Sequence, residues 1–281
     1  MSEGKAWVPT NVTGFFEVIL REDPIKTGSK GVGLNLSKGV YVKVEVERAD
    51  KISVNSNGVS KELLRGFLER RGLCYHVDVD FDYELPPGFG FGVSGAESLG
   101  SLLALGDALS LKVDKEKLAR LAHINEVKNR SGLGDVISQI EGGGIIRVKE
   151  GAPGFGLTES FSIDSKKDLY VTTLSEISTS SILEDKMKVR EINKSAEPKL
   201  SKMREEPNLN NFFDLSKKFT METKLGPEKV VEIIKEVNEE GSKATMVQLG
   251  ASVISMGKPG LLKKYGDVKK VNVSEVGAKI I

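Results

Sequence analysis

The sequence lacks the features that mark several large classes of protein. It contains one cysteine, Cys74, so no disulfide can form within the chain, and we expect this residue to be a small buried hydrophobe. Lys and Arg total 41 against 40 for Asp and Glu, so no global positive field exists to drive nucleic-acid binding. No run of eighteen apolar residues occurs, and the first ten residues lack a signal-peptide pattern. We therefore expect a cytoplasmic protein that binds neither nucleic acid nor membrane.

Glycine, by contrast, is abundant and unevenly distributed. The chain has 30 glycines, where average usage of about 7% predicts roughly 20. Eighteen of them fall in residues 28–39, 88–106 and 132–156, whereas residues 157–281 contain seven. Glycine is favoured where the backbone approaches another group closely or adopts a positive φ. We interpret the three windows as loops that meet at one active site.

The first half of the chain alternates predicted strands and helices. Period-two alternation and β-branched residues predict strands at residues 8–20, 40–48, 74–85 and 145–149. Residues 21–36 are predicted to form a loop, because this segment contains one Pro and three Gly residues. Helices are predicted at residues 60–71, after the loop at 86–95, and at 115–130, where Asp114 is the expected N-cap.

The second half is more strongly helical. We expect a strand at residues 168–174, a polar turn into a helix at 175–183, charged and apolar helices to residue 223, and an amphipathic helix after Pro227. Two closing strands are predicted at 244–257 and 268–281. Phe212 and Phe213 belong either to the core or to an interface, so a homodimer is a candidate assembly.

The middle glycine window has the form of a phosphate-binding loop. A predicted strand, the string PPGFGFGVSG and a buried helix follow one another, so helix N-terminal amides and glycine backbone converge on one point. Walker A is excluded because no G-x-x-x-x-G-K-[ST] string exists, and the H-R-D and D-F-G strings of protein kinases are absent. Gly90, Gly92 and Gly95 match the dinucleotide fingerprint, but the acid expected about twenty residues later would be Asp114, which begins a helix. The remaining interpretation places Ser94 at the helix start, where its hydroxyl reaches a metal held by the phosphates.

Three segments in this order resemble the GHMP kinases, the superfamily of galactokinase, homoserine kinase and mevalonate kinase. They are LPPGFGFGVSGAESL at the phosphate loop, RSGLGDVISQIEGG around Asp135, and a glycine-poor third motif at residues 241–257. Within the superfamily, the segments VTGFFEV, TGSKGVGLNL, HINEVKNRSGLGD and IIRVKEGAPGFG are similar to the archaeal pantoate kinases.

This resemblance implies an α+β fold of two domains. Residues 1–162 would form a ribosomal-protein-like α/β domain that carries the glycine loop, and residues 163–281 a ferredoxin-like α+β domain. It also implies a transferase that uses ATP and Mg²⁺ to phosphorylate the primary hydroxyl of (R)-pantoate, giving 4-phosphopantoate for coenzyme A synthesis.

The resemblance assigns roles to particular residues. Asp135 would accept or orient the substrate hydroxyl, and Ser94 and Glu126 would hold Mg²⁺. Arg147, Lys30, Ser29, His123 and Asn11 would face the substrate, with a cation on its carboxylate. ATP phosphates would lie on the loop formed by Pro87, Gly88, Phe89, Gly90, Phe91, Gly92, Val93, Ser94 and Gly95.

One position departs from the family pattern. The family usually has Pro-Gly-His where this chain has Pro9-Thr10-Asn11, and many superfamily members place a Lys there. Asn11 can supply a hydrogen bond but no positive charge. Asn11 and the glycine-poor third motif therefore make a catalytically silent nucleotide-binding regulator one alternative function. Another small-molecule GHMP kinase, acting on mevalonate or shikimate, is the other alternative.

Overall fold

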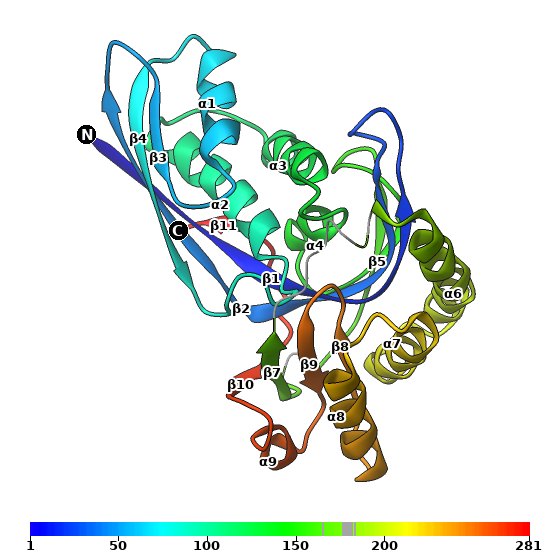
Figure 1. The fold of residues 1–281 in the computed structure, drawn as a ribbon. Coiled ribbons are helices and arrows are strands. Elements are labelled where there is room, and N and C mark those ends of the chain that lie inside the picture. The colour runs from blue at the N-terminus through cyan, green and yellow to red at the C-terminus, as the bar shows by residue number, and fades with distance from the viewer. Residues whose placement is uncertain (165, 176–181, 183) are drawn as a thin grey trace.

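The computed structural model describes residues 1–164, 166–175, 182 and 184–281 (Figure 1). Its first sheet is built on a long antiparallel pair, β1 (Ser2–Ile19) and β2 (Gly28–Arg48). The register of this pair shifts between Pro9 and Asn11 and again between Thr13 and Phe15, which bends the strands. The order is β11-β1-β2-β4-β3, and β5 extends the bent end of β2 and pairs with β6. The remaining strands of this sheet are β3 (Ser53–Ser56), β4 (Tyr75–Tyr83), β5 (Gly144–Lys149), β6 (Leu157–Phe161) and β11 (Lys279–Ile280).

The loop predicted over residues 21–36 is wrong beyond residue 27, because β2 begins at Gly28. Glycine here serves close approach within a sheet. A Cβ on Gly31, whose φ is +143°, would lie 2.2 Å from the carbonyl oxygen of Phe15, and one on Gly33 would lie 2.8 Å from Asn11 Oδ1. Glycines thus let the bent strand pair close on itself.

Three of the helices that precede β5 pack around a fourth, α2. Helix α2 (Val93–Ala108) packs on β1 and β2 and is buried along nearly its whole length, as the apolar sequence predicts. Gly4 and Gly100 allow the contact, since their Cβ atoms would lie 2.1 Å from Ala104 O and 2.5 Å from Val42 Cγ2. The other three are α1 (Lys61–Glu69), α3 (Lys115–Asn129) and α4 (Asp135–Gln139). The Asp114 cap is confirmed, because its side chain accepts a hydrogen bond from the Glu116 N–H.

The second sheet has the order β10-β7-β9-β8. Its strands are β7 (Leu169–Ser175), β8 (Ala244–Val247), β9 (Ala251–Ser255) and β10 (Val268–Val271). Helix α8 (Glu228–Glu239) covers it with the predicted stripe of Val230, Ile233, Ile234 and Val237, and α9 (Pro259–Leu262) follows β9. Residues 244–257 form a hairpin rather than one closing strand, because a turn at 248–250 separates β8 from β9. The helix predicted within 175–183 falls almost entirely outside the described residues.

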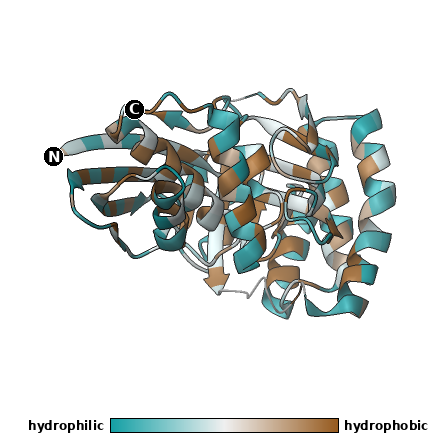
Figure 2. Ribbon diagram, turned by 90° about the horizontal axis from the view of Figure 1, so that it is seen from above, coloured by the Kyte–Doolittle hydropathy of each residue, from teal (hydrophilic) through white to brown (hydrophobic). Residues whose placement is uncertain are grey.

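Helices α6 (Lys186–Glu205) and α7 (Leu209–Thr223) pack against β1. In Figure 2 the helices at this edge of the molecule alternate between hydrophilic and hydrophobic residues, as expected for amphipathic helices on a sheet. Asn193 fixes the docking, because its side-chain amide accepts from the Val18 N–H at 2.7 Å and donates to the Val18 carbonyl at 2.9 Å. Phe212 and Phe213 are fully buried and stack edge to face, so the core interpretation of these residues is the correct one.

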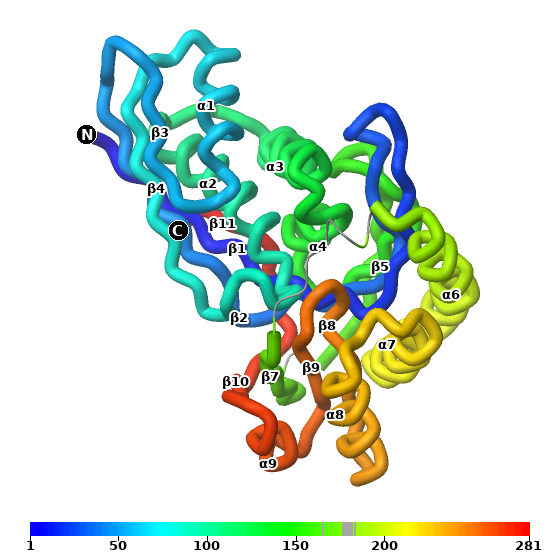
Figure 3. The backbone as a smooth tube through the Cα atoms, in the orientation of Figure 1, coloured from blue at the N-terminus to red at the C-terminus, as the bar shows by residue number. Residues whose placement is uncertain are grey.

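The C-terminal segment returns to the first sheet. The tube in Figure 3 follows it from β10 back to the N-terminal strands. The predicted strand over 268–281 is therefore two short strands in two different sheets, β10 and β11. On the way, the Ala278 N–H donates to the carbonyl of Gln139 at 2.7 Å, and the Gly143 N–H donates to that of Ser274 at 2.6 Å. The C-terminal segment is thus hydrogen-bonded to the end of α4 and to the turn that follows it.

The architecture is the predicted α+β class with two sheets. The boundary at residue 162 falls between β6 and β7, and the division into two domains stays a prediction. No described helix is long and apolar enough to cross a membrane.

Cys74 is exposed, contrary to the prediction of a core residue. Side chains alternate between the two faces of a strand, and Cys74 precedes β4 in step with Asp78 and Asp80 on the outer face. Val77 and Val79 point into the core.

We expect Phe212→Ala to lower the free energy of unfolding by about 3–5 kcal/mol, because a fully buried ring leaves a cavity against α6 and β1. Leu157→Ala, at a side chain that is 57% exposed, is the control and should change stability by less than about 0.5 kcal/mol. Urea unfolding measures both variants. Equal stabilities would contradict the core assignment.

Candidate active site

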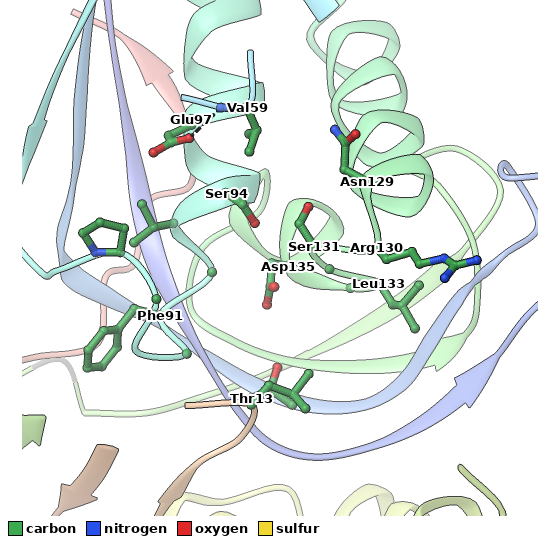
Figure 4. A pocket seen from close by; sticks show the side chains of 18 of the residues that line it. Thr13, Val59, Phe91, Ser94, Glu97, Asn129, Arg130, Ser131, Leu133 and Asp135 are labelled. Carbon is green, nitrogen blue, oxygen red and sulfur yellow. Dashed lines mark hydrogen bonds between the residues drawn. The ribbon is translucent and has the colours of Figure 1, made fainter. Parts of the chain in front are cut away.

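A cavity of about 750 Å³ lies beside the N-terminus of α2. Its walls come from the loop before α2, the segment from the end of α3 to the start of α4, strand β5, and the turn between β8 and β9. Figure 4 shows Phe91 and Ser94 on one wall and Arg130, Ser131 and Leu133 on the opposite wall, with Asp135 between them. All three glycine windows contribute residues to this cavity.

The predicted phosphate loop lies on the cavity wall. Gly88, Gly90 and Gly92 have φ angles of +86°, +85° and +62°, a left-handed backbone that favours glycine, and Gly92 is the N-cap of α2. The Phe91 carbonyl accepts from the Asn11 N–H at 2.9 Å, which ties the loop to β1. Backbone amides at the start of a buried 16-residue helix therefore face the cavity and favour an anion there. Phe89 and Gly95 do not line the cavity.

The third motif lies against this loop. A Cβ on Gly250 would lie 2.1 Å from the Phe89 carbonyl oxygen, and Ser252 Oγ donates to that oxygen at 2.9 Å. Next to it, Leu249 adopts a φ of +63° and lines the cavity. The glycine-poor motif therefore keeps a glycine where its turn packs directly on the backbone of the phosphate loop.

Ser94 and Glu126 form a candidate site for a divalent cation. Ser94 Oγ donates to Glu126 Oε1 at 2.9 Å, while Glu126 Oε2 is buried without a hydrogen-bond partner. Burial raises the pKa of Glu126 to about 8, and the nearby charge of Asp135 acts in the same direction. A buried carboxylate oxygen without a hydrogen-bond partner, next to a hydroxyl, suits a hard cation, so these residues fit Mg²⁺. Among the described residues no cluster of three or more His, Cys, Asp or Glu side chains occurs, so phosphate oxygens and water would complete the coordination.

Asp135 is the first residue of α4 and lines the cavity. Its Oδ1 accepts a hydrogen bond from Asn11 Nδ2 at 2.7 Å. Burial raises the pKa of Asp135, and the Arg147 guanidinium and the Asn11 amide act against that rise. Asn11 therefore supplies a hydrogen bond to the carboxylate, although it cannot supply the charge of a Lys.

Arg147 is placed beside Asp135 by β5. Its side chain is almost fully buried, lines the cavity, and donates from Nη1 to Ser138 Oγ at 3.2 Å. Nε is buried against Gly134 and has no hydrogen-bond partner. Burial lowers the pKa of Arg147 to about 10, so the guanidinium remains charged at neutral pH. A buried, positively charged fork suits a carboxylate.

The other predicted substrate residues separate into two groups. Ser29 lines the cavity, but Lys30 is the next strand residue, points to the opposite face, and pairs with Glu17 at 2.9 Å. His123 is fully buried behind the cavity, where its Nε2 meets the Thr27 carbonyl at 2.9 Å. Burial lowers the pKa of His123, which favours a neutral ring that holds the segment before β2. The structure thus brings Ser29 to the site and leaves Lys30 and His123 outside the cavity wall.

Glycines also pack closely against the carboxylates of Asp135 and Glu126. Cβ atoms on Gly92, Gly95 and Gly132 would lie 3.0 Å from Asp135 Cγ, 3.1 Å from Glu126 Oε2 and 2.5 Å from Glu126 Oε1. One on Gly134 would lie 2.3 Å from Ser29 Oγ. The glycines therefore let backbone pack directly on the buried carboxylates.

Two residues that shape the site, Glu97 and Gln139, were not predicted from the sequence. Glu97, on α2, accepts from Tyr83 Oη at 2.6 Å and from the Val59 N–H at 3.1 Å, and the latter bond is drawn in Figure 4. Gln139 on α4 donates to the Gly92 carbonyl at 2.8 Å, which ties the helix of Asp135 to the phosphate loop. An acid among the small and apolar residues that open α2 was a signal for Glu97, and nothing in the sequence marked Gln139.

Comparison with known proteins decides the family. Residues 58–143 match the model of the GHMP kinases N terminal domain. A pantoate kinase from Thermococcus kodakarensis is 32% identical over 264 residues, which cover 90% of this chain and 87% of that protein. The chain belongs to the pantoate kinase family.

Solved structures agree with this family. A structure described as a phosphotransferase related to the CoA biosynthesis pathway has a TM-score of 0.86 and 27% identity, covering 99% of this chain and 98% of that one. A homoserine kinase from Cytophaga hutchinsonii has a TM-score of 0.73 at 14% identity, covering 100% of this chain and 98% of that one, and shows the shared fold. The GHMP kinase fold expected from the motifs is confirmed, and the family is one of kinases.

The pKa of Glu126 gives a testable pH dependence. It is about 8 in the folded protein against an ordinary value of 4.5, so the folded state binds this proton more tightly than the unfolded chain. Stability without divalent cations should therefore fall as pH rises between about 5 and 8. Glu126→Gln keeps the shape, removes the charge, and should raise the free energy of unfolding at pH 8 by about 1–2 kcal/mol.

Thermal unfolding with and without Mg²⁺ and an ATP analogue measures this effect. Mg²⁺ should stabilise the wild type more than Glu126→Gln, because only the carboxylate offers a charged ligand. Glu239→Gln, at the exposed end of α8, is the control. Identical pH and Mg²⁺ responses in wild type and Glu126→Gln would contradict the metal assignment.

Proposed function

We propose that this protein transfers the terminal phosphoryl group of ATP to the primary hydroxyl of (R)-pantoate, giving 4-phosphopantoate and ADP for coenzyme A synthesis. One observation carries the proposal beyond family membership. Asp135 lies in a single cavity between an anion-binding helix N-terminus and a buried arginine. This arrangement supports a catalytic carboxylate between the proposed phosphate site and the proposed site for the substrate carboxylate.

The reaction needs positioning and charge neutralisation more than covalent help. The hydroxyl oxygen of the substrate attacks the terminal phosphorus while the bond to the oxygen that leaves with ADP breaks. The hydroxyl proton passes to Asp135, which Asn11 holds through the 2.7 Å hydrogen bond. Backbone amides of residues 90–95 bind the phosphates. Mg²⁺, held by Ser94 and Glu126, would neutralise phosphate charge when bound.

The opposite end of the cavity suits a small branched acid. Arg147 offers a buried guanidinium for the carboxylate, and Ser29 offers a hydroxyl beside it. Phe16 and Leu133 supply apolar lining for the two methyl groups of pantoate. Mevalonate and shikimate lack this crowded quaternary carbon next to a primary hydroxyl.

We propose a cytoplasmic reaction, since it consumes ATP.

Asp135→Asn tests the chemistry. The amide oxygen still accepts from Asn11, but the side chain cannot take a proton, so kcat should fall by about 10²–10⁴-fold with ATP affinity retained. ADP release with pantoate, mevalonate and shikimate measures the rate and the substrate. A wild-type protein that acts on mevalonate and not on pantoate would contradict the substrate assignment. An unchanged kcat in Asp135→Asn would contradict the role of Asp135.

A further inference from the structure

The cavity wall carries few positive charges for the ligands proposed above. Among the described residues, the charged side chains that line it are Glu97, Arg130, Asp135 and Arg147. The two acids and two arginines cancel, whereas ATP and a carboxylate substrate together bring several negative charges. Helix amides and one divalent cation cover part of that charge. An additional cation on this wall would therefore have a function.

Arg147 cannot move to meet a phosphate. It is almost fully buried, its charge faces Asp135, and its Nη1 is bound to Ser138 Oγ. Arg130 differs in every respect. Its side chain is 60% exposed, and its salt-bridge partner in the described part of the chain is Glu184, itself 59% exposed. An ion pair this exposed to solvent contributes little to stability, so it is readily exchanged for a stronger anion.

The backbone holds Arg130 at a fixed place on the wall. It is the C-cap of α3 in a left-handed conformation, with φ +54°, and its N–H meets the carbonyls of Glu126 and Val127. The same helix end therefore carries both the buried carboxylate of the metal site and this exposed guanidinium. Lys224 ends α7 in the same left-handed conformation, so this geometry is an ordinary helix end that fixes where the Arg130 side chain starts.

We propose that Arg130 is a further catalytic residue that leaves Glu184 and binds the terminal phosphate of the nucleotide. Asp135 receives the acceptor hydroxyl, so the phosphate being transferred must lie beside it. Figure 4 places Arg130 at the end of α3, across from Phe91 and Ser94 of the phosphate loop, with its side chain extending away from Asp135, so the guanidinium turns inward when it leaves Glu184. The inner phosphates face the loop amides, and the terminal one faces the wall of Arg130. A guanidinium there stabilises the charge that develops during transfer.

The proposal rests on the proposed kinase function, and nucleotide binding tests it without a second substrate. We expect Arg130→Ala to weaken binding of a non-hydrolysable ATP analogue by about tenfold or more and binding of ADP by less than about threefold. With pantoate present, kcat/KM for ATP should fall by about 10²-fold. Arg130→Lys keeps the charge without the fork and should lie between wild type and Arg130→Ala.

Glu184→Gln is the matched control, because it breaks the same ion pair and leaves the cation in place. It should bind the analogue as well as wild type or more tightly. Equal losses in Arg130→Ala and Glu184→Gln would overturn the proposal by showing that only the ion pair matters. Equal losses for ADP and the ATP analogue would also overturn it. A wild type that binds ATP but does not phosphorylate pantoate would instead contradict the proposed function and leave the binding result for Arg130 intact.

Discussion

Glu126 and Asp135 are buried in the same site, and the surrounding structure is arranged to hold these two carboxylates. Burial raises the pKa of both carboxyl groups, and the nearby charge of Asp135 raises the pKa of Glu126 further. Arg147 and Asn11 offset the charge of Asp135, but Glu126 Oε2 has no partner at all. An unpaired buried carboxylate lowers the stability of a fold unless a ligand compensates for it. A cation bound to Glu126 would stabilise its charged form, which supports the proposed metal site.

The glycine distribution follows from the same constraint. Residues 92, 95, 132 and 134 bring backbone within van der Waals reach of the carboxylates, Arg147 and Ser29, where any side chain would collide. The β8–β9 turn and the C-terminal tail then hold the phosphate loop and α4 from outside, through Gly250 and Ala278. Elements far apart in sequence thus fix the position of Asp135 relative to the phosphate loop.

Much of this arrangement is predictable from the sequence. The order of strand, glycine loop and buried helix has a clear physical reason, and so does an acid at a loop-to-helix junction such as Asp135. Other features depend on long-range pairing. Residues 28–36 look like a loop by composition, yet they form a strand because glycine permits the bend against β1. Lys30 was misplaced because its face depends on the register with Glu17, and the position of Gln139 depends on how α4 docks.

Anomalous diffraction from crystals grown with Mn²⁺ and a non-hydrolysable ATP analogue would locate the cation, since Mn²⁺ replaces Mg²⁺ at oxygen sites. We expect an anomalous peak within bonding distance of Ser94 Oγ and a Glu126 carboxylate oxygen, facing the loop of residues 88–95. A nucleotide-bound structure in which the peak is held by other residues, with Glu126 still unpartnered, would contradict it.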